Sequence, residues 1–215
     1  MTMKRPSRRT TALATTAAVL AAGLTLTAAA SPGGTRHHGA GDGDGGYGFV
    51  DVRAGVPDAA ARFTVTSPDL RNGGRFPAGA WANAFGCSGG NRQVRLAWHG
   101  APADTRSYAV TMFDPDAPTG AGFWHWTTWD IPATTTGLDT TPPPGTVTGT
   151  NDAGATGYLG PCPGAGDITH RYQITVYALD TPTLGLPATT PPTVTAFTMS
   201  SHVIGYARLT ADARR

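Results

Sequence analysis

The sequence contains little charge, because only 14% of its 215 residues are Asp, Glu, Lys or Arg. Its single lysine, Lys4, lies near the amino terminus, so Schiff-base or general-base chemistry by lysine is excluded from the rest of the chain. Residues 1–30 carry four of the 16 basic residues and no acidic residue, which leaves 12 basic against 14 acidic residues, a net charge of −2, in residues 31–215. A weakly acidic domain lacks the electrostatic means to bind nucleic acid, so no nucleic-acid partner is expected.

A long hydrophobic run is also missing, and the amino terminus is instead typical of a secretory signal. The basic segment MTMKRPSRR is followed by the weakly apolar segment TALATTAAVLAAGLTLT and by three alanines at 28–30 that resemble a cleavage site. The apolar segment is short and rich in Thr and Ala, which disfavours the alternative of a stable membrane anchor. We therefore predict that residues 1–30 are a signal peptide and that the mature protein is secreted or extracytoplasmic.

Cysteine is scarce, with Cys87 and Cys162 the only two in the sequence. An even number of cysteines in an oxidising compartment favours a disulfide between them. Two separate buried thiols are the alternative, which sequence spacing does not exclude. Residues 31–48 are rich in glycine and lack apolar periodicity, so we predict a flexible leader before the folded domain.

From residue 49 to 215 the pattern predicts one domain that is mainly β. Five β-branched and aromatic runs are separated by Gly, Pro, Asp and Asn clusters: FTVTS, QVRLAWH, SYAVTMFD, WTTWDI and RYQITVYALD. In the second run Val94, Leu96 and Trp98 alternate with more polar residues, as in a half-buried strand. A helical pattern occurs only late, in TVTAFTMSSHVIGYARL (193–209), where the residues at three- and four-residue spacing are Val194, Phe197, Ser201, Ile204 and Arg208.

The segment GCSGG (86–90) suggests a hydrolase triad. Ser88 would be the nucleophile, and Asp114 and either His125 or His170 would be its partners. The nucleophile elbow requires a strand before the serine and a helix after it, whereas the residues after Ser88 resemble a strand. This context argues against a nucleophile elbow, so a secreted serine hydrolase is the alternative function and not the main prediction. A metal site assembled from Asp114, Asp116 and the two histidines lacks the tight spacing of metal ligands, so neither a metal nor a cofactor is expected.

An anion-binding pocket is suggested by the last strand-like segment, HRYQITVYALD (170–180). His170, Tyr172, Ile174 and Val176 share one face of this strand, which places two polar side chains at the rim of an apolar core. The preceding GYLGPCPG (157–164) supplies glycines whose amides can approach an anion closely. The alternative, that His170 is an ordinary strand-edge histidine and the glycines only serve a turn, stays open on spacing alone.

Several motifs in order along the chain carry a family resemblance. They are DPDAP (114–118), HW (125–126), DIP (130–132), GYLGPCPG (157–164), HRYQITVYALD (170–180) and HVIGYARL (202–209). In this order and spacing the chain resembles the phosphatidylethanolamine-binding protein family, and most closely its bacterial branch of Raf kinase inhibitor-like proteins. The segment CSGGNRQVRLAW lacks the serine-proline approach common in that family, and the loop TTPPPGTVTG is this chain's own.

The resemblance implies an antiparallel β-sandwich with a C-terminal helix and a non-enzymatic pocket for anions or phospholipid head groups. Its role would be ligand carriage or inhibition of a kinase or protease. The pocket residues carried over are Asp114, His125, Gly160, Pro161, His170 and Tyr172. The histidines and Tyr172 would donate to phosphate oxygens, and Asp114 would orient a histidine or meet an ammonium group. The resemblance also implies a cis bond between Ala117 and Pro118.

Overall fold

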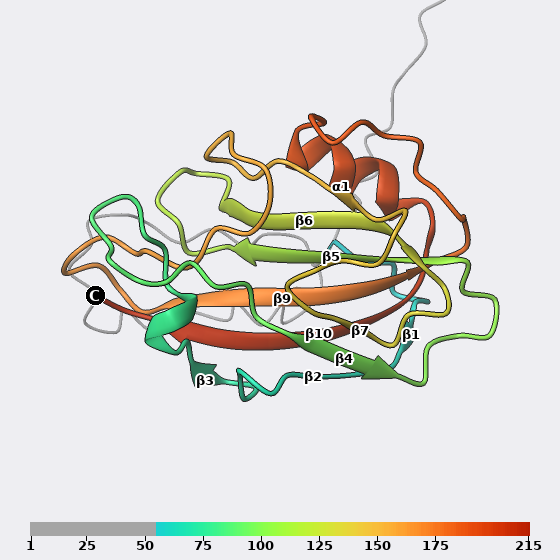
Figure 1. Ribbon diagram of the computed structural model, residues 1–215, viewed down its shortest axis with the longest axis horizontal. Coiled ribbons are helices and arrows are strands. Elements are labelled where there is room, and N and C mark those ends of the chain that lie inside the picture. Colours follow the sequence, from blue (N-terminus) through green and yellow to red (C-terminus); the bar gives the residue numbers. More distant parts are fainter. Residues whose placement is uncertain (1–54) are drawn as a thin grey trace, which may run out of the picture. The chain divides into compact units, whose positions relative to one another are not determined.

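The computed structural model describes residues 55–215, so the predicted signal peptide (1–30) and leader (31–48) lie outside the described residues. Ten strands, one short 3-10 helix and one α-helix follow in chain order (Figure 1). They are β1 (Ala61–Arg62), β2 (Thr64–Thr66), β3 (Gly74–Arg75), η1 (Ala78–Ala80), β4 (Leu96–His99), β5 (Ser107–Asp114), β6 (Phe123–Pro132), β7 (Gly137–Leu138), β8 (Val147–Thr148), β9 (His170–Leu179), α1 (Pro192–Ser200) and β10 (Val203–Ala213).

These strands form two sheets. The larger sheet has the order β1-β10-β9-β5-β6-β8, and β3 also pairs with β10, while the smaller sheet has the order β2-β4-β7. Each adjacent pair among the long strands β10, β9, β5 and β6 is antiparallel, and only the two-residue strands β1 and β3 pair with β10 in parallel. The predicted mainly-β fold of sandwich type with one C-terminal helix is therefore confirmed.

The large sheet is covered on both faces, which explains why every residue of β5 is buried. One face packs against the small sheet, and the main apolar core lies between them. This core includes Val65, Leu96, Trp98, Val110, Met112, Ile174, Val176 and Leu209. A second apolar cluster on the other side brings together Ala109, Trp129, Tyr177, Leu179, Met199, Val203 and Tyr206.

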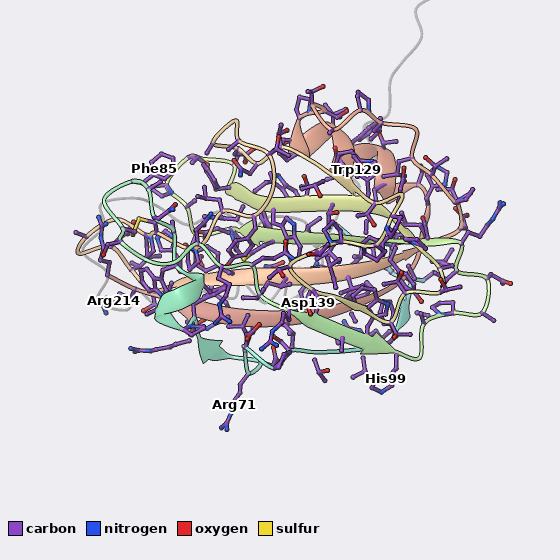
Figure 2. The ribbon with its side chains drawn as sticks, in the orientation of Figure 1. Arg71, Phe85, His99, Trp129, Asp139 and Arg214 are labelled. Carbon is purple, nitrogen blue, oxygen red and sulfur yellow. A yellow bond between two sulfur atoms is a disulfide. The ribbon has the colours of Figure 1, made fainter. Side chains whose placement is uncertain are left out.

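The small sheet shows the alternation expected of strands with one solvated face. Leu96 and Trp98 of β4 are buried, whereas Ala97 and His99 are exposed, and His99 points away from the domain in Figure 2. Val94, just before this strand, is buried as the sequence pattern predicted. Among residues 55–215 no helix is long and apolar enough to span a bilayer.

The predicted helix over 193–209 is correct only in its first half. Helix α1 ends at Ser200, and from Val203 onward the chain forms β10, which pairs with β9 along its whole length. The apolar residues of β10 alternate with period two from residue 207 to 213, and pairing with a central strand outweighs the helical spacing. The predicted packing face of the helix is also wrong, because Val194 and Phe197 are 48% and 80% exposed.

The predicted cis bond between Ala117 and Pro118 is wrong, because every described peptide bond is trans. The turn after β5 is built from side-chain and main-chain hydrogen bonds instead. The amide of Asp116 donates to Asp114 Oδ1 at 3.0 Å, and the amide of Thr119 donates to the carbonyl of Ala117 at 2.7 Å. Gly120 then adopts a positive φ of 78°, so the chain reverses without a cis bond.

Candidate functional site

Three neighbouring strands bring Asp114, His125 and His170 to one end of the large sheet. Asp114 is the last residue of β5, His125 is the third residue of β6, and His170 is the first residue of β9. Because β6 and β9 both run antiparallel to β5, their amino-terminal ends lie beside its carboxyl-terminal end. Residues 56 positions apart in the sequence therefore meet in a hydrogen bond.

His170 is held between two carboxylates. Its Nδ1 lies 2.8 Å from Asp114 Oδ2, and its Nε2 lies 3.2 Å from Asp167 Oδ2. Both ring nitrogens can donate at once only when the imidazole is protonated. Burial opposes that charge, but the hydrogen bonds and negative charges of Asp114 and Asp167 outweigh burial and raise the pKa of His170. The position of His170 between two acidic side chains thus favours its imidazolium form.

His125 lies in the opposite electrostatic state. Its Nδ1 lies 3.1 Å from the carbonyl oxygen of Leu159, while its Nε2 lies 3.9 Å from Asp114 Oδ2. Burial lowers the pKa of His125 more than the nearby charge of Asp114 raises it. A neutral ring whose Nδ1–H donates to Leu159 keeps a lone pair on Nε2. That lone pair faces the carboxylate, so the space between these groups favours a proton donor.

Tyr172 packs beside both histidines on the same face of the sheet. Its ring centroid lies 5.0 Å from that of His125, 6.3 Å from that of His170 and 5.3 Å from that of Phe76. Burial, and then the charge of Asp114, raise the pKa of Tyr172. The phenol therefore stays protonated at neutral pH, and its hydroxyl interacts with Asp114 and with the backbone of Cys162.

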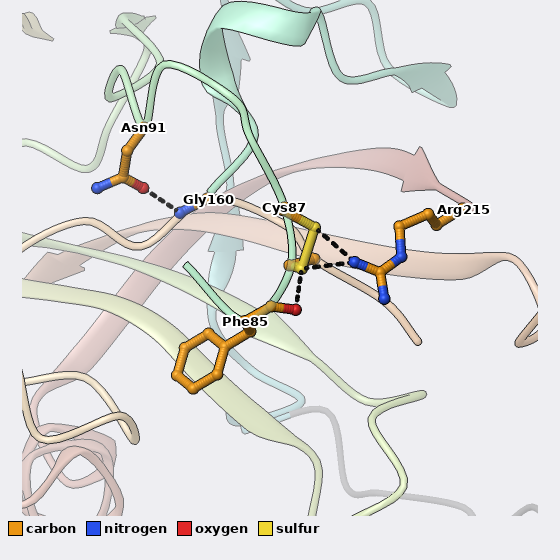
Figure 3. The surroundings of a disulfide bond; sticks show 6 residues. Phe85, Cys87, Asn91, Gly160 and Arg215 are labelled. Atoms are coloured by element: carbon orange, nitrogen blue, oxygen red, sulfur yellow. Dashed lines mark hydrogen bonds between the residues drawn. A yellow bond between two sulfur atoms is a disulfide. The ribbon is translucent and has the colours of Figure 1, made fainter. Parts of the chain in front are cut away.

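The turn at Gly160 and Pro161 covers this cluster, and its packing requires glycine. A Cβ atom on Gly160 would lie 2.1 Å from the carbonyl oxygen of Ala80, so no side chain fits. The amide of Gly160 donates to Asn91 Oδ1 at 2.8 Å, as Figure 3 shows. The carbonyl of Pro161 accepts from the amide of Ala82 at 3.2 Å. Gly160 thus contributes close packing, and its N–H group, which the sequence suggested for an anion, is already paired.

The predicted disulfide between Cys87 and Cys162 is present, and its ends lie 75 positions apart in the sequence (Figure 3). It joins the loop before β4 to the turn that follows Gly160 and Pro161. The guanidinium of Arg215 lies 3.4 Å from Cys87 Sγ and 3.7 Å from Cys162 Sγ. The covering turn is therefore held by a covalent bond on one side and by Asn91 on the other.

Three side chains of this region were not among the predicted ligand-binding residues, although Asp116 was considered as a metal ligand. Asp167 contacts His170, Asn91 holds Gly160, and Asp116 Oδ2 accepts from the amide of Arg171 at 2.7 Å. The sequence carried one weak signal, an acidic residue three positions before His170 in a glycine-rich loop. Asn91 is 69 residues away from Gly160, and no local pattern links them.

The expected position of two site residues is wrong. His170 and Tyr172 were expected at the rim of the core, but only 2% and 1% of their surfaces are exposed.

The elbow that a Ser88 nucleophile would need is absent from the described residues around it, because Ser88 lies in an irregular loop between η1 and β4. The nitrogens of His125 and His170 face Leu159 and the two carboxylates described above.

The arrangement combines hydrogen-bond donors and acceptors around a small buried region. Its donors are a phenol and an imidazolium, and its acceptors are carboxylates and a neutral imidazole nitrogen. Within residues 55–215 no group of three or more His, Cys, Asp or Glu side chains is placed to hold a metal ion. The groups at hand suit reversible binding of a small polar molecule through hydrogen bonds and charge.

Comparisons with known proteins show which proteins this chain resembles. Residues 66–214 match the family model described as phosphatidylethanolamine-binding protein. The chain is 40% identical over 159 residues to the UPF0098 protein YbcL of Escherichia coli strain K12, a match that covers 70% of this chain and 87% of that protein. It is also 34% identical over 161 residues to LppC, a candidate lipoprotein of Mycobacterium tuberculosis, covering 74% of this chain and 76% of that one.

Solved structures of proteins described as PEBP members or homologues also resemble this chain in fold. The crystal structure of E. coli YbcL, described as a new member of the mammalian PEBP family, superposes with a TM-score of 0.70 at 39% sequence identity, covering 72% of this chain and 99% of that chain. The homologue CT736 of Chlamydia trachomatis superposes with a TM-score of 0.62 at 25% identity, covering 73% and 99%.

Proposed function

Because the chain belongs to the phosphatidylethanolamine-binding protein family, we propose that it is an exported, non-enzymatic protein that binds a small phosphate-bearing molecule such as a phospholipid head group. The binding residues in this proposal are Asp114, His125, Gly160, Pro161, His170 and Tyr172. The hydrogen-bonding groups come from Asp114, His125, His170 and Tyr172, and the Gly160–Pro161 turn covers them. The family fold is consistent with a non-enzymatic binding protein.

The buried ionic cluster is the observation that carries this proposal. Asp114 and His170 are each 2% exposed at the end of an otherwise apolar core. Burying an ion pair costs so much desolvation that apolar residues of similar volume often give equal or greater stability. A polar cluster that the fold does not need for stability is a candidate for a binding role.

A phosphate group matches the donors of this cluster. The Tyr172 hydroxyl and the His170 imidazolium can donate to phosphate oxygens, and His125 can join them once it gains a proton. An anion beside His125 favours its charged form and raises its pKa, so binding takes up a proton. Affinity for phosphate is therefore expected to fall as the pH rises above the pKa of His125 in the complex.

The cellular setting follows from the amino terminus and from one relative. Residues 1–30 resemble a signal peptide, and LppC is named as a candidate lipoprotein, which supports an extracytoplasmic location. In that setting the protein would carry its ligand or inhibit a protein target, a kinase or a protease. No cofactor, nucleic acid or stable membrane anchor is part of this proposal.

A titration followed by NMR tests the ligand site. Phosphorylethanolamine is added to the ¹⁵N-labelled domain, and amide shifts are expected at residues of the site, including Tyr172, His125 and Gly160. Replacing His125 with Ala removes one charge-assisted hydrogen bond and should weaken binding by roughly 10- to 100-fold.

His202 provides the matched control, because it also pairs with an aspartate but lies outside the site. His202→Ala should bind phosphorylethanolamine as the wild type does. Equal affinity of wild type and His125→Ala, or shifts that map to residues other than those of the site, would contradict the proposed site.

A further inference from the structure

Resting on the proposed function, we propose that Asp167 is an internal competitor of the ligand. Its carboxylate occupies the outward nitrogen of His170, and an anionic ligand binds by displacing it. The residue would thereby set both the affinity for phosphate and the selectivity of the site between anions of different charge.

The two nitrogens of His170 face different surroundings. Nδ1 points to Asp114, whose side chain is 2% exposed, and Nε2 points to Asp167, whose side chain is 14% exposed. The route from the surface to the imidazole therefore ends at Nε2, and Asp167 Oδ2 already lies 3.2 Å from it. An oxygen of a phosphate group would make the same charge-assisted hydrogen bond that this carboxylate oxygen makes.

The segment that carries Asp167 is exposed, and few hydrogen bonds hold the Asp167 carboxylate in place. The neighbouring residues 164–166 are exposed, and Gly166 has a positive φ of 78°. Apart from His170, the Asp167 carboxylate accepts only from the amide of Ile168, at 2.8 Å, among its hydrogen bonds to described residues. That contact is between adjacent residues and moves with the segment, so displacement of the carboxylate breaks only its bond to His170, three residues along the chain.

The negative charges around His170 explain why an anionic ligand would displace Asp167. The groups around His170 are Asp114 from β5, Asp116 from the turn after β5, Asp167 from its own segment, His125 from β6 and Tyr172 from β9. The carboxylates of Asp114 and Asp167 therefore flank His170, with Asp116 beside Asp114, and a phosphate added to them meets repulsion. If Asp167 moves towards solvent, the ligand replaces its charge instead of adding to it.

Asp167→Asn is the variant that isolates this role, because it removes the charge while keeping the size and an acceptor oxygen. Inorganic phosphate, phosphorylethanolamine and ethanolamine are titrated separately, so that phosphate binding is distinguished from recognition of the amine. We expect Asp167→Asn to bind both phosphate compounds at least about tenfold more tightly than wild type, the size of one hydrogen bond to a charged group. The amide of Ile168 should shift in the wild type on phosphate addition.

Asp180→Asn is the matched control, because Asp180 also contacts a histidine and its removal changes the net charge equally. It should leave phosphate affinity unchanged. Asp167→Ala repeats the measurement should the asparagine variant unfold, which circular dichroism would reveal. Equal phosphate affinity of wild type and both Asp167 variants, with binding still at the site, overturns the competitor role and leaves the proposed function standing. Weaker binding by the variants also overturns it, because Asp167 would then help to hold the ligand. Absence of phosphate binding in all proteins overturns both.

Discussion

The two ends of strand β9 carry the same chemical pair in different surroundings. At its first residue, His170 Nδ1 lies 2.8 Å from Asp114, and both side chains are 2% exposed. Just beyond its last residue, Asp180 lies 2.9 Å from Nδ1 of His202, and their side chains are 50% and 38% exposed. Nearly equal distances thus coexist with very different access to water. The difference shows that burial, rather than the contact itself, decides what a histidine–aspartate pair can do.

Water explains the contrast. At the exposed end, solvent screens both charges and competes for their hydrogen bonds, so the pair contributes little. At the buried end, each charge depends on its protein partners, and the whole polar cluster responds when one of them is removed. The buried end is also the one that the disulfide and Asn91 hold in place. The variants that follow test this contrast.

Removing the disulfide should have the largest effect. In the chain-entropy model, closing a loop of this length stabilises the folded state by about 4–5 kcal/mol. Cys87→Ser/Cys162→Ser should therefore unfold at much lower urea concentration, and amide shifts should change around His170 but not around His202. A loss of stability below about 1 kcal/mol would show that the loop is already restricted in the unfolded chain.

Asp114→Asn should have the next largest effect. It removes the carboxylate that the buried His170 faces, and breaking a buried pair costs about 3–5 kcal/mol, with the lower end expected because Asp167 remains beside the ring. Asp180→Asn at the exposed end should cost only about 0.2–1 kcal/mol. Urea unfolding of the two variants measures both values. Equal losses would contradict the contrast between the two ends.

The two buried histidines should titrate on opposite sides of the ordinary value of 6.5. Because the pKa of His170 is raised on folding, its contribution to stability is fully present below about pH 6.5 and is lost as the pH rises through its folded pKa. Because the pKa of His125 is lowered, its contribution is present above pH 6.5 and is lost as the pH falls through its folded pKa. Each tenfold difference in proton affinity corresponds to about 1.4 kcal/mol.

NMR titration of the ring protons of His125 and His170 checks these directions. The midpoint of His170 should fall in Asp114→Asn, because the variant removes the nearer carboxylate. Midpoints in the reverse order, with His125 above His170, would show that the electrostatic account of the cluster is wrong.

The smallest effect is expected for Phe197 of helix α1, which precedes His202, and the buried Met199 of the same helix provides the comparison. Phe197 is 80% exposed, so Phe197→Ala should change the free energy of unfolding by no more than about 0.5 kcal/mol. Met199 is 2% exposed in the second apolar cluster, and Met199→Ala should cost about 2–5 kcal/mol. Thermal unfolding of both variants compares them, and a large loss in Phe197→Ala would show that this side chain is covered in solution.

The long strands were predictable because their signal is local. The segment SYAVTMFD was predicted as a strand, and β5 has the same bounds, Ser107–Asp114. The inward alternation of Val94, Leu96 and Trp98 was visible in the period of the sequence. The family motifs also indicated which residues would meet at one end of the sheet, since each lies at the end of such a strand.

The remaining features depend on contacts between distant segments. The two-residue strands β3, β7 and β8 are too short to leave a period in the sequence. The end of α1 was missed because the residues after it satisfy a helical spacing as well as a strand spacing, and only pairing with β9 decides between them. The contact between Asp167 and His170 was missed because it depends on how a loop folds back.

The place of β10 in the large sheet has a consequence for synthesis. This strand is the last of the described chain, yet it lies between β9 and the short strands β1 and β3. A chain that emerges amino end first therefore holds β9 with one edge unpaired, and β1 and β3 without a partner, until residues 203–213 have appeared. Unpaired edges of this kind recruit other strands, so the nascent protein needs protection from aggregation during that interval. Truncation before residue 203 should yield insoluble protein.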